Sequence, residues 1–165
     1  MQLDNFFEDL EAQFEYQLDA ARSQSTLEDC NLIRVKRLDG RAVELAMPLL
    51  GADFVAGMTL GANDFKIFRF SNLAQINFLK LENANLPKIR VMKMSFSAFL
   101  GQVPAPFEIT WVTSGSPQVN SGMLIDQMGE LLLLQVLHST NVLGVPVTVV
   151  EELGIVSVEN FGTTF

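Results

Sequence analysis

The chain has 165 residues, of which 11 are basic and 19 acidic, so its formal net charge is −8. An apolar fraction of 48% suffices for a core in one domain of ordinary size or in two very small ones. Charged residues make up 18% of the chain, which argues against intrinsic disorder. No apolar run reaches the about 20 residues of a membrane-spanning helix, and the acidic N-terminus does not resemble a signal peptide. We therefore expect no membrane partner.

Cysteine and histidine are scarce. The single Cys30 excludes an internal disulfide and is typical of a reducing compartment, so we expect a cytoplasmic protein. One cysteine and one histidine are too few for a Cys/His zinc site. The sequence contains neither a phosphate-binding nor a dinucleotide-binding glycine motif. We predict no metal and no cofactor.

Charge and pattern divide the chain into four parts. Residues 1–30 hold eight acidic residues and one basic, and residues 31–80 hold seven basic and four acidic. Residues 81–105 sum to +2, and residues 106–165 carry six acidic residues and no Lys or Arg. A nucleic acid would therefore find a basic surface only in the middle of the chain.

Residues 3–22 are predicted to form an acidic amphipathic helix. Apolar side chains recur at spacings of three and four, which places them on one face: Phe6, Leu10, Phe14, Leu18 and Ala21. The polar stretch that follows is a connection to the next part of the chain.

From Asn31 the apolar pattern changes to a period of two, which is typical of strands. Ile33 and Val35 alternate with Arg34 and Lys36, and the Asp39-Gly40 dipeptide favours a tight turn. We expect strands over 32–38, 41–47, 53–60, 65–70 and 75–79, with one helical turn at 71–74.

The same order of elements recurs in residues 106–165. Strands are expected over 107–113, 118–126, 131–137, 145–150 and 154–158, with a connection at 138–144 and a helical turn at Glu151–Leu153. The sequence therefore predicts an internal repeat of one supersecondary unit. Between the two copies, Pro87 and an apolar face up to Phe99 favour a linking helix, although residues 88–96 also alternate as a strand would.

These features resemble a known fold. The Asp39-Gly40 turn, Gly51 with Asp53, and the SNL and EEL turns are similar to small SH3-like barrels, and the preceding helix favours their Sm (Lsm) variant. The whole chain resembles a bacterial family, of no established biochemical activity, that joins a helix, one such barrel, a linking helix and a second barrel. The resemblance implies a mainly β protein with two tandem five-stranded barrels, at 31–80 and 106–165. It departs from RNA-binding Sm proteins, which tend to carry Asn near Leu50 and Ala52 and an Arg-Gly pair absent from FKIFRFSN.

One basic cluster is a candidate nucleic-acid site: Arg34, Lys36, Arg37 and Arg41. With Phe68 or Phe70 nearby, these cations would contact RNA phosphates while the rings stack on bases. The opposing interpretation is a solvated strand face whose charges are balanced by the acidic residues of 1–30, and the acidic net charge of the chain favours it.

No residue is predicted to be catalytic. His138 stands without the partners of a base or metal ligand, and acidic neighbours would raise the pKa of the Cys30 thiol. Ser114-Gly115-Ser116 lacks the spacing of a nucleophile elbow and is interpreted as a hairpin turn. Glu151 and Glu152 are expected to cap or solvate a turn.

The remaining acidic and apolar residues point to surfaces. Glu8, Glu11 and Glu15 are expected to form a solvated helix face with no metal. The apolar strand 131–137 should be covered on both sides, and Phe96, Phe99, Phe161 and Phe165 add apolar area beyond what two tiny barrels bury.

We therefore expect a noncatalytic cytoplasmic interaction module, an adaptor or regulatory component that binds another protein or itself. The alternative is an RNA-binding protein that uses the basic face of the first repeat. Changing Arg34, Lys36 and Arg37 to Glu would abolish the RNA function and leave the protein contacts largely intact.

Overall fold

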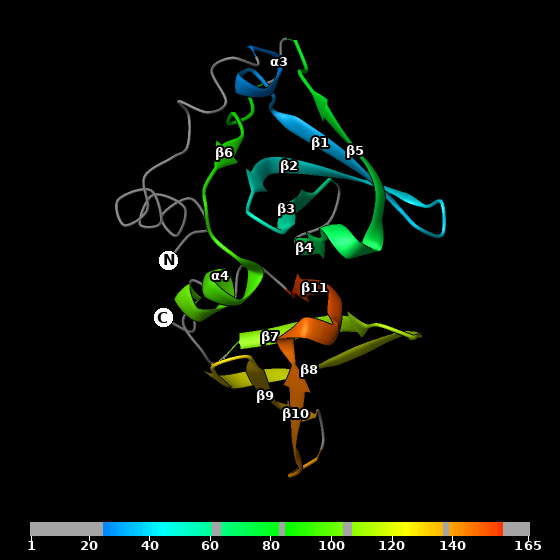
Figure 1. Cartoon of the computed structure of the whole chain (residues 1–165), viewed down its shortest axis with the longest axis vertical. Helices are drawn as coiled ribbons and strands as arrows, with labels where there is room; N and C mark the ends of the chain where they lie inside the picture. Colours follow the sequence, from blue (N-terminus) through cyan, green and yellow to red (C-terminus); the bar gives the residue numbers. More distant parts are fainter. Residues whose placement is uncertain (1–24, 61–63, 83–84, 104–106, 137–138, 157–165) are drawn as a thin grey trace.

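A computed structural model describes residues 25–60, 64–82, 85–103, 107–136 and 139–156. Figure 1 shows two β-rich halves stacked along the long axis, with a linking segment along one side. Several sequence predictions lie outside the described residues: the helix over 3–22, the row Glu8, Glu11 and Glu15, His138, Phe161 and Phe165.

The first half follows the sequence prediction closely. A short helix α3 (Ser25–Glu28) precedes five strands and one 3₁₀ turn: β1 (Leu32–Arg37), β2 (Ala42–Leu50), β3 (Phe54–Thr59), β4 (Phe65–Arg69), η1 (Phe70–Asn72) and β5 (Leu73–Leu79). The Asp39-Gly40 turn is confirmed, since Gly40 adopts a φ of 91° and the Asp39 carboxylate accepts the Arg41 backbone N–H.

The second half has the same elements in the same order. They are β7 (Phe107–Thr113), β8 (Ser116–Met128), β9 (Leu131–Val136), β10 (Val142–Pro146), η2 (Val147–Val149) and β11 (Val150–Ile155). Two predictions were wrong here. The fourth strand lies partly in the expected connection, and the helical turn is Val147–Val149, so that Glu151–Leu153 belongs to a strand.

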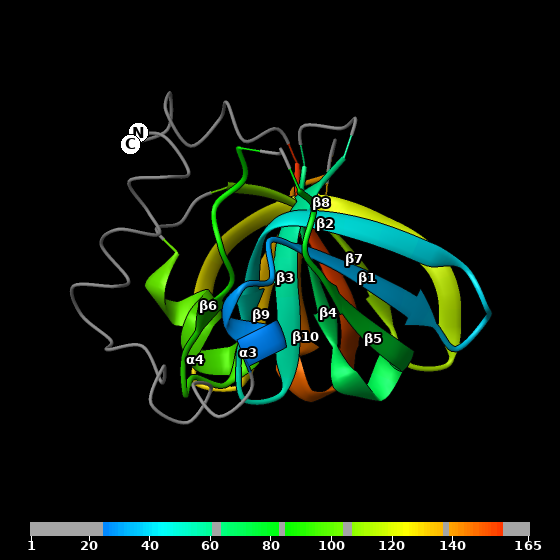
Figure 2. The same cartoon turned by 90° about the horizontal axis from the view of Figure 1, so that it is seen from above.

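The linking segment is mostly extended, contrary to the favoured helix from Pro87. β6 (Arg90–Val91) pairs in parallel with β2, and α4 (Phe96–Gln102) begins only after Ser95, whose hydroxyl accepts the Ala98 backbone N–H as an N-cap. The alternation of apolar and basic residues in this extended segment reflects its packing, because Ile89, Met92 and Met94 are buried while Lys88 and Lys93 are exposed. β6 and α4 lie along the same side of the sheet (Figures 1 and 2).

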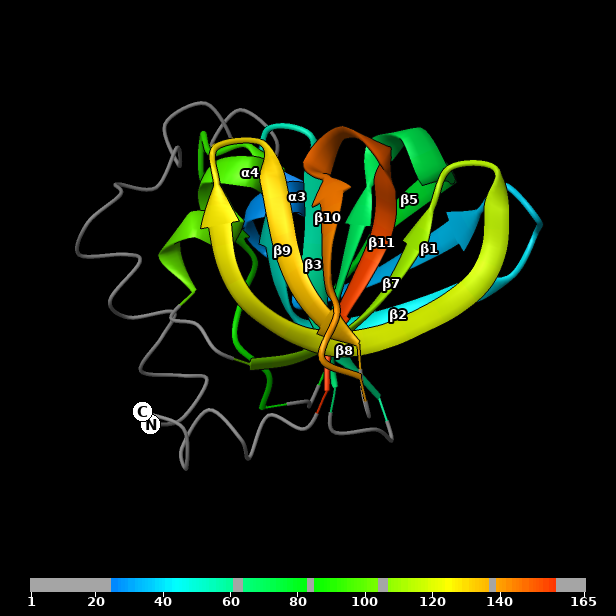
Figure 3. The same cartoon turned by 90° about the horizontal axis from the view of Figure 1, so that it is seen from below.

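The protein is mainly β, as predicted, but its described strands form one open sheet in place of two closed barrels. The strand order is β10-β9-β8-β7-β11-β4-β3-β2-β1-β5, with β6 paired to β2 off this path. Each half therefore contributes five neighbouring strands, and the antiparallel pair β11–β4 joins the halves. Strong curvature, visible in β8 from below (Figure 3), curls each half over its core.

The two halves also repeat the same pairing register. β4 and β10 are offset by 77 residues, as are η1 and η2. A bulge in the β1–β5 pairing, between Lys36 and Arg37, recurs between β7 and β11 at Val150/Glu152. The repeat predicted from the sequence pattern is thus confirmed in the strand order, with a corrected alignment.

A single main core spans the junction. It combines residues of β2, β3 and β4, the linking segment and most elements of the second half, including Phe54, Phe65, Phe99 and Trp111. The Phe99 ring lies 5.3 Å from that of Phe54 and 6.2 Å from that of Phe65, measured between ring centroids. A smaller core fills the first half around Ile33, Val55 and Phe68. In β9, Leu132 and Leu134 are buried but Leu131 is 37% exposed, so this strand is not covered on both sides as expected.

Candidate functional site

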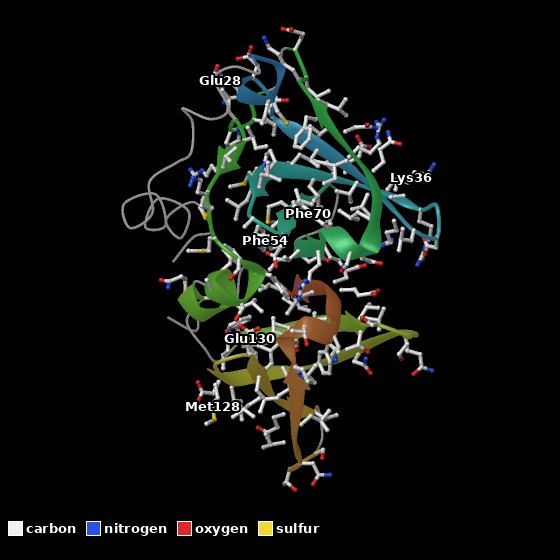
Figure 4. All side chains as sticks on the ribbon, in the orientation of Figure 1. Glu28, Lys36, Phe54, Phe70, Met128 and Glu130 are labelled. Carbon is white, nitrogen blue, oxygen red and sulfur yellow. The ribbon has the colours of Figure 1, made fainter. Side chains whose placement is uncertain are left out.

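The basic cluster of the first half does not form one open cationic face. Arg34 donates to Glu44 across β1 and β2 at 3.2 Å, and Arg41 pairs with Asp39 at 2.8 Å within the hairpin turn. Lys36 points outward from β1 at the border of the first half (Figure 4) and has no ion pair among the described residues. The carboxylates that pair with the cluster come from 31–80 and 106–165. The expected balance by the acidic residues of 1–30 falls largely outside the described residues.

Arg37 is the member of the cluster that lies deepest. Its Nε and Nη2 donate to the two carboxylate oxygens of Glu152 at 3.0 and 2.8 Å, which makes the pair bidentate. The Arg37 side chain is 16% exposed and that of Glu152 8%. Lys66 Nζ lies 3.5 Å from the same Glu152 carboxylate. Glu152 therefore sits in β11 and binds two cations of the first half, contrary to the expectation that it caps or solvates a turn.

Of the two rings expected to stack on RNA bases, Phe68 does not lie at the surface. Phe68 is fully buried, and the Arg37 guanidinium lies 5.4 Å from the centre of its ring. Phe70 is 38% exposed at the 3₁₀ turn after β4. Because Arg37 is held at the junction and Phe68 lies beneath it, the cations and rings do not present the joint surface that base stacking requires.

An open hollow of about 480 Å³ lies beside this ion-pair network, between the two halves. Its lining includes Arg37, Lys66 and Glu152, together with Asp39 and Arg41 from the hairpin turn. These charges already pair with one another. The lining thus carries three cations and three carboxylates, and of the latter Glu151 alone has no ion pair among the described residues.

Asp39 and Arg41 shift each other's pKa in the hairpin turn. The backbone N–H of Arg41, followed by its guanidinium, lowers the pKa of the exposed Asp39 carboxyl, and this carboxylate in turn raises the pKa of Arg41. Within the described ranges, no group of three or more His, Cys, Asp or Glu residues is placed to hold a metal ion.

Cys30 is a buried thiol. Burial raises its pKa, as predicted in direction, although desolvation rather than the neighbouring acidic residues is the leading cause. Its Sγ donates to the Leu32 carbonyl at 3.2 Å. A thiol in this state is a poor nucleophile. Ser114 and Gly115 form the turn between β7 and β8, with a Gly115 φ of 77°, which confirms the interpretation as a hairpin.

The more distinctive surfaces are the two ends of the sheet. β5 and β10 each have a strand neighbour on one side only among the described residues. β10 carries exposed apolar side chains, with Val142 53% and Leu143 42% exposed, and Val149 in the following turn is 36% exposed. An unpaired apolar edge strand is a template for pairing with another chain.

The β10 edge was not predicted, because residues 138–144 were interpreted as a connection. The offset of 77 residues from FKIFR to VLGVP was the available signal. It was hidden because the repeat was aligned on the wrong turn, four residues further along the chain.

No helix in the described parts of the chain has the length and apolar character needed to cross a membrane. No protein-family model matches the chain, and comparison with curated proteins finds no similar sequence.

Proposed function

We propose that this protein is a noncatalytic interaction module that binds other polypeptides by adding a strand to an edge of its sheet. The observation that carries the proposal is the pair of unpaired edge strands, one of which exposes Val142 and Leu143. Strand addition gains main-chain hydrogen bonds from the edge, and alternate side chains provide selectivity. The single buried, free Cys30 supports a cytoplasmic setting for this activity.

The proposal includes a finer description of the fold. Each half is a five-stranded unit of the SH3-like class and of its Sm-like type, and it is open where a barrel would be closed. The chain is a tandem pair of such units. Support comes from the order β4-β3-β2-β1-β5 and its repetition as β10-β9-β8-β7-β11, together with the 3₁₀ turn before the last strand of each half. Fold alone does not identify a ligand, so the function depends on the edges.

RNA binding is the weaker candidate. Three of the four predicted cations are paired with carboxylates, at Glu44, Asp39 and Glu152. Nonspecific RNA binding depends on cations that are free to neutralise phosphates. The pairing therefore supports a protein ligand over RNA.

The test is a peptide selection against the full chain. A displayed library of random peptides is selected on the wild-type protein, and the resulting peptides are measured against two edge variants, Val142→Lys/Leu143→Lys in β10 and Gln75→Lys/Asn77→Lys in β5. Lysine on an edge strand opposes pairing. We expect selected peptides to lose at least about tenfold in affinity for one of the edge variants, which corresponds to about 1.4 kcal/mol.

The matched control is Leu38→Lys/Leu60→Lys, which places two lysines on exposed apolar residues outside both edge strands. Its peptide affinity should equal that of the wild type. Peptides that bind all four proteins equally would overturn the proposal. So would salt-sensitive binding of labelled single-stranded RNA that is lost in Arg34→Glu/Lys36→Glu. Arg37 is left unchanged in that variant because it holds the junction.

A further inference from the structure

We infer that the polypeptide received by these edges is a second copy of this chain, joined head to tail by pairing β5 of one molecule with β10 of the next. This inference rests on the proposed function, and it names the partner. The argument comes from the junction inside the chain, where β4 of the first half pairs antiparallel with β11 of the second. β10 and β5 are the repeat equivalents of β4 and β11, so each molecule presents both partners of the same joint.

The repeat fixes which residues would face one another. Inside the chain, the joint pairs Phe65 with Ile155, Lys66 with Gly154, Ile67 with Leu153 and Phe68 with Glu152. The offset of 77 residues between the two halves converts these into pairs between molecules. The expected register is Val142 with Phe78, Leu143 with Asn77, Gly144 with Ile76 and Val145 with Gln75.

The edge strand β10 is more exposed than β4, the equivalent strand of the joint inside the chain. Phe65 is fully buried against β11, whereas Val142 at the equivalent position of β10 is 53% exposed. Ile67 is fully buried, and its equivalent Gly144 is exposed. β10 therefore leaves open the positions that β4 covers with a neighbouring strand.

The β11 side shows the same difference. Ile155 and Leu153 are buried, whereas their equivalents in β5, Phe78 and Ile76, are only half-buried. A second copy would place Phe78 against Val142 on the core side of the sheet. Both edges thus lack cover at the positions that the internal joint covers.

Neither edge strand carries a charged residue that would oppose this pairing. The seven residues of β5 and the five of β10 include no Asp, Glu, Lys or Arg. Charged side chains on an edge strand are a common device against such pairing, and neither edge uses it. Pro146 ends β10 at the position equivalent to Arg69, which lies outside the four pairs of the internal joint. Its missing N–H therefore removes no hydrogen bond from the expected ladder.

A joint of this type uses different surfaces on the two molecules, so the assembly is a closed ring or an open chain and not a two-fold dimer. The equivalent of the Arg37–Glu152 pair would be Thr113 facing Gln75, because Arg37 and Thr113 hold the same place in the β1–β5 and β7–β11 pairings. The joint between molecules is therefore uncharged at this point and should persist at high salt.

The test uses native mass spectrometry and light scattering on the full chain over a wide concentration range. The wild type should form species of more than one chain. Val142→Lys/Leu143→Lys blocks β10, Gln75→Lys/Asn77→Lys blocks β5, and each variant alone should be a monomer. Mixing the two should restore a species of two chains only, because each variant retains one intact edge. Leu38→Lys/Leu60→Lys should assemble like the wild type.

A wild type that remains monomeric overturns this inference, and it leaves the peptide selection as a separate test of the proposed function. A two-chain species in one edge variant alone would point to a two-fold dimer and also overturns it. So does a mixture of the two variants that stays monomeric.

Cross-linking tests the register without relying on the lysine variants. Cα atoms of opposed residues in an antiparallel pair lie about 4.5–5.5 Å apart, within the range of a disulfide. Asn77→Cys mixed with Leu143→Cys should give a disulfide-linked pair of chains under mild oxidation, and Leu38→Cys mixed with Leu143→Cys should not. Equal cross-linking in the two mixtures contradicts the register.

Discussion

Arg37 and Glu152 are separated by 115 positions in the chain and form the most buried ion pair of the junction. Removing two charges from water is costly, and the two hydrogen bonds between them offset that cost only in part. The pair therefore contributes little net free energy while both members are present. Loss of one member is different, because it leaves the other charge buried without its partner.

We predict that Arg37→Ala and Glu152→Ala each lower the free energy of unfolding by about 3 kcal/mol. The double substitution Arg37→Met/Glu152→Leu should cost less than either single change, because neither member is left buried without the other and Lys66 keeps its ion pair with Asp64 at 3.9 Å. Urea denaturation followed by circular dichroism measures all three. The exposed Arg34 serves as the control, and Arg34→Ala should change stability by no more than about 1 kcal/mol. Equal losses at Arg34 and Arg37 would contradict the assigned role of the junction pair.

The basic residues themselves were evident in the sequence, but their partners were not. Arg34 and Lys36 were correctly placed on one face of a strand by the alternation of residue types. The pairing of Arg37 with a carboxylate in the other half depends on the joint between β4 and β11, which local patterns do not encode. Phe68 was misplaced for another reason, since it is buried in the core of the first half and not on its surface.

At the scale of elements, strands with strict alternation were predicted well and short turns were not. β1 to β5 lie within a few residues of their expected positions. Val147–Val149 was interpreted as strand because its residues are β-branched or strand-forming, yet the chain turns there and Arg69 donates to the Val147 carbonyl at 2.8 Å. A tertiary contact thus overrides local propensity at this turn.

Gly57 gives a prediction at this scale. It lies in β3 opposite the irregular part of β2, where Met47 adopts a φ of 50°. A Cβ added at Gly57 would lie 2.6 Å from the Ala46 carbonyl oxygen and 2.8 Å from the Leu45 Cβ. Since backbone must move to relieve this overlap, Gly57→Ala should lower the free energy of unfolding by about 1–3 kcal/mol.

Gly101 is the matched control for that substitution. It lies in α4, and its added Cβ would come no closer than 4.0 Å to Gln127. Gly101→Ala should therefore leave stability unchanged or raise it by up to about 1 kcal/mol, as expected for Ala over Gly in a helix. Thermal denaturation compares the two variants, and an equal loss at both positions would contradict the close approach of β2 to Gly57.

At the scale of the whole molecule, the repeat does not produce two independent domains. The main core takes buried residues from β2, β3 and β4, from the linking segment and from most elements of the second half. The strands of the halves join in one sheet. Sequence patterns identified the two units, but the sharing of one core depends on how α4 and β11 pack between them.

The shared core predicts one cooperative unfolding transition for the two halves. Trp111, the only tryptophan of the chain, is buried in the second half and reports on it by fluorescence. Hydrogen exchange of β1 and β3, followed by mass spectrometry, reports on the first half. Both probes should give the same denaturation midpoint in urea.

Phe99 is the residue whose loss tests this coupling, because it is fully buried in α4 and its ring lies next to Phe54 and Phe65 of the first half. Phe99→Ala should cost about 3–5 kcal/mol and shift both probes together. Phe70→Ala removes a ring that is 38% exposed and should shift both much less. A Phe99→Ala protein whose first half unfolds while Trp111 stays buried would contradict a common core. Coincident shifts would mean that the junction transmits the loss, because a cavity opened in the linking helix would then weaken both halves at once.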